Sequence, residues 1–181
     1  MKPRITPIGG KDDLAPEHHA LADRVLGVFG SIRGPFSMLL HSPPLAERLL
    51  PLVPWFREGS IVDHNLRLIG VLAAVREREA EYVWGAQVGL ARELGVREAA
   101  IDLLRAKGDP ASLTVPEQEV VAYARQLMRT NRIEQSVFDA LNHRHGAQWL
   151  VEFTAAINYY AMLCGMANAF EVPARPDADR Y

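Results

Sequence analysis

Cysteine is almost absent from this chain, and other familiar functional features are missing as well. Its 181 residues include a single cysteine, Cys164, which excludes an internal disulfide and any two-thiol redox centre within one chain. The sequence has no glycine-rich phosphate-binding loop, no nucleophile elbow and no metalloprotease helix. The short motifs that usually reveal an activity therefore give no assignment here.

Neither positive nor negative charge dominates the sequence. The 20 Lys and Arg residues against 22 Asp and Glu residues give a formal net charge of −2, and the two signs are interspersed. A basic stripe for nucleic acid and a polybasic segment for anionic lipid are both lacking. The first residues lack the apolar core of a signal peptide, and we expect no apolar stretch of about 18 residues that could cross a membrane. We therefore expect a soluble, cytoplasmic protein that binds neither nucleic acid nor membrane.

Strand-like alternation is also absent, and helical periodicity replaces it. Residues 66–75 are apolar on nearly every side and residues 81–94 form a second helical run, with the charged link RERE between them. Such a short link predicts two central helices packed antiparallel. Thr114 and Glu117 have the spacing of a capping box. The other expected helices cover residues 16–30, from 43 onward, 96–107, 115–129, 133–142 and 147–170, so the predicted fold is all-α.

The hydrophobic content of 49% fits one globular domain. Residues 1–15 are rich in proline, glycine and charge, which predicts an extended arm that is either loose or laid on a neighbouring subunit. Residues 16–175 should form a single helical domain. Residues 176–181 follow two prolines and are predicted to be a solvated tail.

Three polar side chains interrupt the second central helix. Glu81, Trp84 and Gln87 recur every three residues, so we expect them along one face. The indole could raise the pKa of Glu81 by desolvation, although Glu81 could equally complement the helix N-terminus or pair with an arginine. Gln87 is either a hydrogen-bonding group for a carboxylate or carbonyl, or a satisfied buried amide. His64 is either an acid or base near neutral pH or an exposed histidine at a helix start.

Other polar groups lie near the end of the chain. Tyr159 and its neighbours interrupt the last apolar helix, where they either line a pocket or lock helix packing. His143 and His145 are two residues apart, a spacing that directs side chains on a helix to different sides. Because no cysteine or carboxylate stands beside them at ligand spacing, we expect no metal.

Residues 76–101, with the element Glu-Tyr-x-Trp, resemble the carboxymuconolactone decarboxylase family and the related alkylhydroperoxidase-D-like proteins. The resemblance covers roughly residues 36–175 and rests on the order and spacing of several elements: His41-Ser42-Pro43, Arg76-Glu77, Tyr159-Tyr160, Asn168-Ala169-Phe170 and Glu171-Val172-Pro173. It implies an all-α homo-oligomer, a trimer or hexamer, with the site between the two central helices.

The chain departs from this family at its reactive positions. The peroxidase branch carries a Cys-x-x-Cys-x-x-x-His pattern where this sequence has Ala80, Val83 and Gln87, and a relay glutamate where it has Leu68. Decarboxylase-like members usually have a histidine at the position of Gln87.

Two functions follow as expectations. The first is a cofactor-free, decarboxylase-like lyase acting on a small carboxylate or lactone, with His64, Glu81 and Gln87 as catalytic residues and Trp84 and Tyr159 as pocket walls. The second is a non-catalytic family member that binds a ligand or partner. Thiol peroxidase activity is predicted to be lost in either case.

Overall fold

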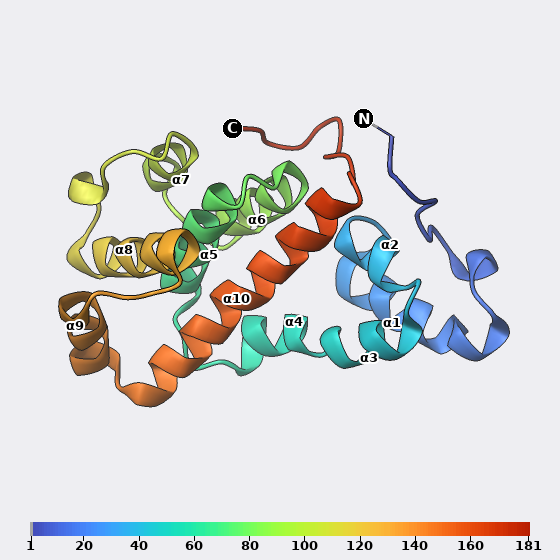
Figure 1. Ribbon diagram of the computed structural model, residues 1–181, viewed down its shortest axis with the longest axis horizontal. Helices are drawn as coiled ribbons and strands as arrows, with labels where there is room; N and C mark the ends of the chain where they lie inside the picture. The colour runs from blue at the N-terminus through green and yellow to red at the C-terminus, as the bar shows by residue number, and fades with distance from the viewer. Residues whose placement is uncertain (1) are drawn as a thin grey trace.

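The computed structural model describes residues 2–181, and their regular structure is entirely helical, which confirms the predicted all-α fold (Figure 1). The first half contains α1 (His19–Phe29), α2 (Pro35–Leu39), α3 (Pro43–Leu49), α4 (Leu52–Pro54), the π-helical turn η3 (Trp55–Gly59) and α5 (His64–Glu77). The second half contains α6 (Glu81–Glu93), α7 (Glu98–Arg105), α8 (Val115–Thr130), α9 (Gln135–His145) and α10 (Ala147–Ala169). Short 3-10 turns are η1 (Lys11–Asp13), η2 (Pro16–His18) and η4 (Pro110–Ser112).

Helix α5 is the centre of the fold. Asp63 caps it, because its carboxylate accepts hydrogen bonds from the backbone N–H groups of Asn65 at 2.9 Å and Leu66 at 3.0 Å. Residues 67–75 are all buried, and α6, α7, α8 and α10 pack around them. The central pair α5 and α6 is joined by a three-residue turn and packs together, as the sequence predicted.

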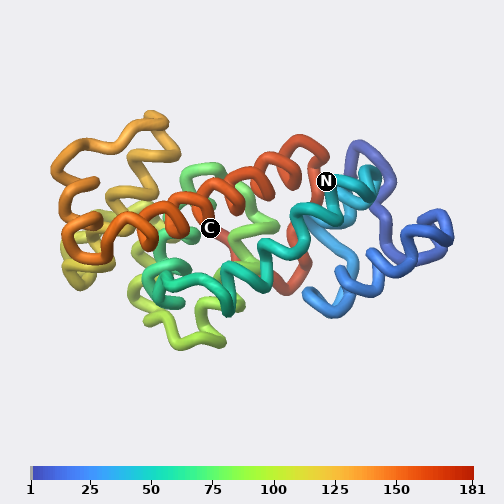
Figure 2. The backbone as a smooth tube through the Cα atoms, turned by 90° about the horizontal axis from the view of Figure 1, so that it is seen from below, coloured from blue at the N-terminus to red at the C-terminus, as the bar shows by residue number. Residues whose placement is uncertain are grey.

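Helix α10 connects the two ends of the molecule. It packs on α9 at one end, on α5 and α6 in the middle and on α2 at the other end (Figures 1 and 2). Its contact with α5 is so close that an added Cβ at Gly70 would lie 2.4 Å from the Phe153 ring. With 23 residues, α10 is long and apolar enough to cross a membrane, and half of its most apolar window is buried in the fold. The expectation that no segment would reach this length is therefore wrong, since a core helix covered on several sides has the same composition.

Most local signals for helix ends are confirmed. Thr114 and Glu117 form the predicted capping box at the start of α8. Gly30 ends α1 in a left-handed conformation with φ 71°. After α3, the prolines at positions 51 and 54 leave only the short α4 and then the π-helical turn η3, in which the Ser60 N–H donates to the Trp55 carbonyl at 3.0 Å.

Both ends of the chain pack on the helices of the same chain. In the N-terminal arm, the backbone N–H of Arg4 donates to the Phe170 carbonyl, and that of Ile8 to the Ser37 carbonyl, each at 3.0 Å. The arm is thus attached to helices of its own chain. The solvated tail predicted for residues 176–181 is also wrong, because Asp179 pairs with arginines of α6 and α7 and Tyr181 packs on α5 and α6. Local composition does not reveal such long-range partners.

Replacing Trp84 should destabilise the protein more than replacing Gln87. The Trp84 side chain is completely buried, and truncating such an indole to alanine typically costs about 3 to 5 kcal/mol. Gln87 borders a cavity and its Oε1 has no partner in the described residues 2–181, so Gln87→Ala should cost less. Urea denaturation of the two variants measures the difference. Equal stability would show that the core is not organised around Trp84.

Candidate functional site

A cavity of about 150 Å³ lies where the chain between α1 and α2, the turn η3, and helices α6 and α10 meet. A cavity of this size can hold a benzene-sized ring. Its apolar walls are Phe29, Pro35, Phe36, Val53, Val83, Ala86 and Leu163, and its polar side chains are Ser31, Arg33, Arg57, Tyr82, Gln87, Tyr160 and Arg175. The cavity therefore combines an aromatic and aliphatic surface with several hydrogen-bond donors.

Gly34 brings Arg33 and Tyr82 together at the cavity. It has φ 61°, and an added Cβ would lie 2.1 Å from the Tyr82 ring. No other residue type fits, because a side chain would be strained by the backbone conformation and would collide with the ring. The close approach of this loop to α6 places Arg33 in the cavity wall.

Three arginines line the cavity: Arg33 and Arg175 are exposed, and Arg57 is half-buried. Arg175 forms an ion pair with Asp177 at 2.9 Å. Within residues 2–181, Arg33 and Arg57 form no ion pair with a carboxylate. The Arg57 guanidinium instead lies over the Phe29 ring at 5.8 Å. The cavity carries excess positive charge, which favours an anionic ligand.

The π-helical turn η3 positions Arg57. Its Phe56 carbonyl accepts a hydrogen bond from the guanidinium of Arg67, which is only 2% exposed and begins the buried part of α5. Burial lowers the pKa of Arg67, while the nearby Tyr160 and Asp63 favour its charged form. Because this buried cation holds η3 against α5, the backbone position of Arg57, on the same turn, is fixed. Such π-helical turns are frequent at functional sites.

Tyr160 is the most deeply buried hydroxyl in the cavity wall, with 4% of the residue exposed. Burial raises its pKa above the ordinary value, and the charges of Arg57 and Arg67 and hydrogen bonding from Arg57 and Gln87 oppose that rise. The phenol is therefore protonated at neutral pH and can donate a hydrogen bond to a ligand oxygen.

Gln87 faces the same cavity from α6. It is 6% exposed, and its Oε1 has no hydrogen-bond partner within residues 2–181. A buried polar atom without a partner is costly, and a ligand in the cavity could supply the missing donor. Rotation of the amide would present its N–H₂ group instead, so Gln87 can meet either a donor or an acceptor.

Of the five site residues predicted from sequence, only Gln87 lines this cavity. His64 is exposed at the start of α5, where its Nδ1 lies 3.2 Å from Arg67. Glu81 borders a different surface groove, and Trp84 packs edge-on against Tyr181 at 5.9 Å. Tyr159 donates its hydroxyl hydrogen to the Leu49 carbonyl at 3.0 Å and so ties α10 to α3.

Glu81, Trp84 and Gln87 do not share one face of α6 as we expected, and the reason is geometric. Each residue turns an α-helix by about 100°, so residues six apart, such as Glu81 and Gln87, point about 120° away from each other. Their side chains consequently reach different surroundings. The missed residues Arg33, Arg57 and Arg175 lie outside α-helices, where an arginine is usually a solvated charge. Tyr160 could have been chosen over Tyr159 only by knowing which side of α10 faces α6.

The two histidines near the start of α10 are not part of the cavity. His143 is exposed on α9, and the His145 ring stacks on Trp149 with centroids 4.1 Å apart. Within residues 2–181, no three His, Cys, Asp or Glu side chains are grouped as a metal site would require.

Comparison with known proteins gives the class of fold. No protein-family model matches the chain, and no curated protein matches it. Among solved structures, a similar one is the debrominase Bmp8, in a cysteine-to-alanine variant complexed with 2,3,4-tribromopyrrole. The TM-score is 0.75 at 14% sequence identity, over 97% of this chain and 95% of that one. This likeness shows that the chain has the same helical fold as that debrominase.

Cys164 should be unreactive in the folded protein. It is fully buried on α10, and burial raises its pKa to about 12, whereas the thiolate is the reactive form. We expect no steady turnover of an organic hydroperoxide with a dithiol reductant, and alkylation by iodoacetamide at pH 8 only after unfolding in urea. Turnover that disappears in Cys164→Ser would contradict this assignment.

Proposed function

We propose that the cavity binds a small ring-shaped carboxylate or lactone and that the chain acts on it without a cofactor, as a decarboxylase-like lyase. The observation that carries the proposal is that Arg33 and Arg57, which form no ion pair within residues 2–181, share one cavity with the buried Oε1 atom of Gln87, which has no hydrogen-bond partner there. An anion with a hydrogen-bonding substituent would satisfy all three groups. The fold similarity to a debrominase crystallised with a small ring compound agrees with a ligand of this size.

The polar side chains suggest how such a ligand would lie. Hydrogen bonding from Arg57 and Gln87 opposes the rise that burial causes in the pKa of Tyr160. The charges of Arg175 and Arg33 likewise oppose the rise in the pKa of Tyr82. In our proposal the carboxylate contacts Arg33 and Arg57, and a conjugated carbonyl oxygen accepts a hydrogen bond from Tyr160. The apolar walls formed by Phe36 and Val53 hold the ring.

This arrangement provides what decarboxylation needs. When the bond between the ring and the carboxylate carbon breaks, CO₂ leaves and the electron pair moves onto the conjugated carbonyl oxygen as an enolate. The neutral Tyr160 phenol and the Arg57 guanidinium are donors for that developing negative charge. Protonation of the ring carbon by water completes the reaction. Neither an oxidant nor a reductant is required.

A non-catalytic binding protein is the second candidate, and one observation favours it. The residues that line the cavity include no cysteine, histidine, aspartate or glutamate. A protein that only binds its ligand needs the arginines and the apolar walls but no proton-transfer group. Binding and turnover must therefore be measured separately.

Benzoate should bind, and Arg57 should contribute to its affinity. Hydrogen bonds to charged groups contribute about 1.5 to 3 kcal/mol, so Arg57→Met should weaken benzoate binding roughly 10- to 100-fold. Isothermal titration calorimetry measures this, with neutral benzamide as the matched ligand and Arg132→Met, an exposed arginine on the α8–α9 connection, as the control variant. Equal affinity for benzoate and benzamide would reject an anion site.

Tyr160→Phe should separate catalysis from binding, because it removes only the hydroxyl. Loss of one donor to a developing oxyanion typically lowers kcat by about 10²- to 10³-fold, whereas benzoate affinity should stay within about 3-fold. The assay is CO₂ release from small conjugated lactone acids. Wild-type protein that binds these acids without releasing CO₂ would support the non-catalytic candidate. Unchanged turnover in Tyr160→Phe would remove Tyr160 from the mechanism.

A further inference from the structure

The C-terminal segment 175–181, called the strap below, forms part of the cavity wall. After α10 the backbone turns at Glu171, where φ is 53°, and the chain runs back across α6 (Figure 1). Its first residue, Arg175, borders the cavity, with 55% of its side chain exposed and its guanidinium paired with Asp177. Arg175 and Tyr82 also border the groove that the strap forms with α6. The strap therefore joins the cavity to a second set of contacts farther along α6.

The strap packs on α6 at Gly85, and this contact is called the seat below. An added Cβ at this position would lie 2.7 Å from the Cβ of Ala178 and 3.0 Å from the backbone oxygen of Asp179. A side chain at position 85 would have to displace the strap. At Gly89, one turn farther along the same helix, an added Cβ would have no atom within 4 Å.

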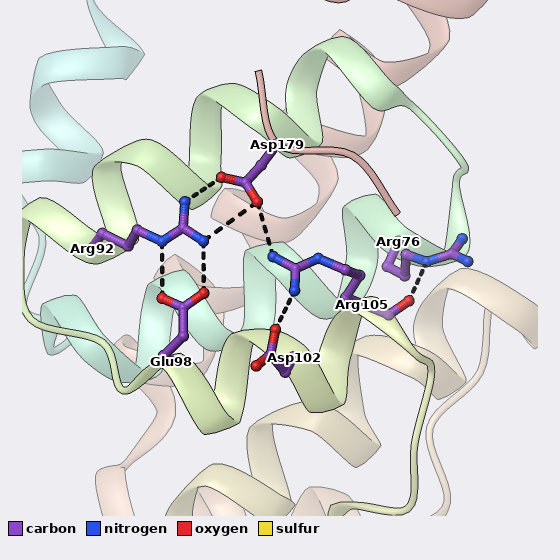
Figure 3. A network of polar contacts seen from close by, with 6 residues as sticks. All are labelled: Arg76, Arg92, Glu98, Asp102, Arg105 and Asp179. Atoms are coloured by element: carbon purple, nitrogen blue, oxygen red, sulfur yellow. Dashed lines mark hydrogen bonds and ion pairs between the residues drawn. The ribbon is translucent and has the colours of Figure 1, made fainter. Parts of the chain in front are cut away.

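A network of charges holds the middle of the strap (Figure 3). Asp179 accepts hydrogen bonds from Arg92 on α6 and from Arg105 on α7, the latter at 2.9 Å. Hydrogen bonding from Arg92 lowers the pKa of Asp179, so the residue is a carboxylate at neutral pH. Arg92 is itself oriented by Glu98 at 2.6 Å, and Arg105 by Asp102. The strap is thus attached to two helices through a single side chain.

Tyr181 provides a third attachment. The Arg76 guanidinium lies over its ring at 3.9 Å from the centroid, and the Trp84 ring meets it edge-on. Burial raises the pKa of Tyr181 to about 12, so its hydroxyl is neutral. The strap is held at Gly85, at Asp179 and at Tyr181, and all three contacts lie beyond Arg175 in the chain.

Displacement of the strap at Gly85 would also move Arg175, because only two residues separate Arg175 from Ala178. The Ala178 N–H donates to the Arg175 carbonyl at 3.1 Å and closes a tight turn. Within that turn, Asp177 holds the Arg175 guanidinium at 2.9 Å. Ala178, whose Cβ would meet a side chain at position 85, therefore closes the same turn that presents Arg175 to the cavity.

We propose that Gly85 and Asp179 are positioning residues for the cavity: by seating the strap they hold Arg175 in the wall and so set the affinity for the anionic ligand. This inference rests on the proposed anion-binding function. Neither residue lines the cavity. Both act through Arg175, and the ligand affinity is regulated by how firmly the strap is seated.

The test compares Gly85→Ala with Gly89→Ala. Each variant adds one methyl group to α6, and each favours the helix by itself. Hydrogen exchange of the Ala178 N–H, which donates to the Arg175 carbonyl, should rise at least 10-fold in Gly85→Ala, and benzoate affinity should fall at least 5-fold. Gly89→Ala should match wild type in both measurements. Asp179→Asn, which adds no volume, should change both in the direction of Gly85→Ala and serves as the test if Gly85→Ala does not fold.

A double-variant cycle shows whether the effect passes through Arg175. Arg175→Met alone should weaken benzoate binding, and adding Gly85→Ala to it should cause little further loss, since the two changes remove the same interaction. Additive losses would overturn the inference, as would a loosened strap with wild-type benzoate affinity. Failure of wild-type protein to bind benzoate would instead reject the proposed function, and with it the role of the strap.

Discussion

Burial of one helix on every side is the constraint on which this structure depends. Residues 67–75 of α5 are inaccessible, so four helices must surround them. The backbone polar groups of α5 are satisfied within the helix, but the single charge in this stretch, Arg67, needs external partners. It finds them in the Phe56 carbonyl and in His64. The packing of α5 thereby fixes the π-helical turn, which in turn carries Arg57.

The cavity is a consequence of that packing rather than of a local motif. Arg33 arrives from a loop that can approach α6 only because of Gly34, Arg57 from a π-helical turn and Arg175 from the strap. Each of these segments is held to the helical core by its own contacts. The result is a ring-sized space with excess positive charge in a fold otherwise dominated by apolar helix contacts. The buried Gln87 Oε1 has no hydrogen-bond partner within residues 2–181, whereas the Arg33 and Arg175 side chains reach solvent, and an anionic ligand is the proposed occupant that would contact all of these groups.

The helices could be read from the sequence because their signals are local. Apolar periodicity located α5, α6 and α10, and the Thr114 capping box located the start of α8. The residues of the site could not be predicted in the same way, because the site forms where segments distant in the sequence come together. Of the predicted side chains only Gln87 lies at the cavity, while Trp84 and Tyr159 proved to have structural contacts. The seat of the strap at Gly85 depends on a contact with residues 178 and 179, which no local pattern predicts.

The fold is shared with a solved structure at a sequence identity of 14%, and a shared fold does not by itself determine function. The central claim is that this cavity binds an anion, and a crystal structure of the protein soaked with benzoate tests it most directly. The account predicts the ring between Phe36 and Val53, with the carboxylate within hydrogen-bond distance of Arg33 or Arg57. An empty cavity at saturating benzoate, or benzoate bound only elsewhere on the surface, would contradict it.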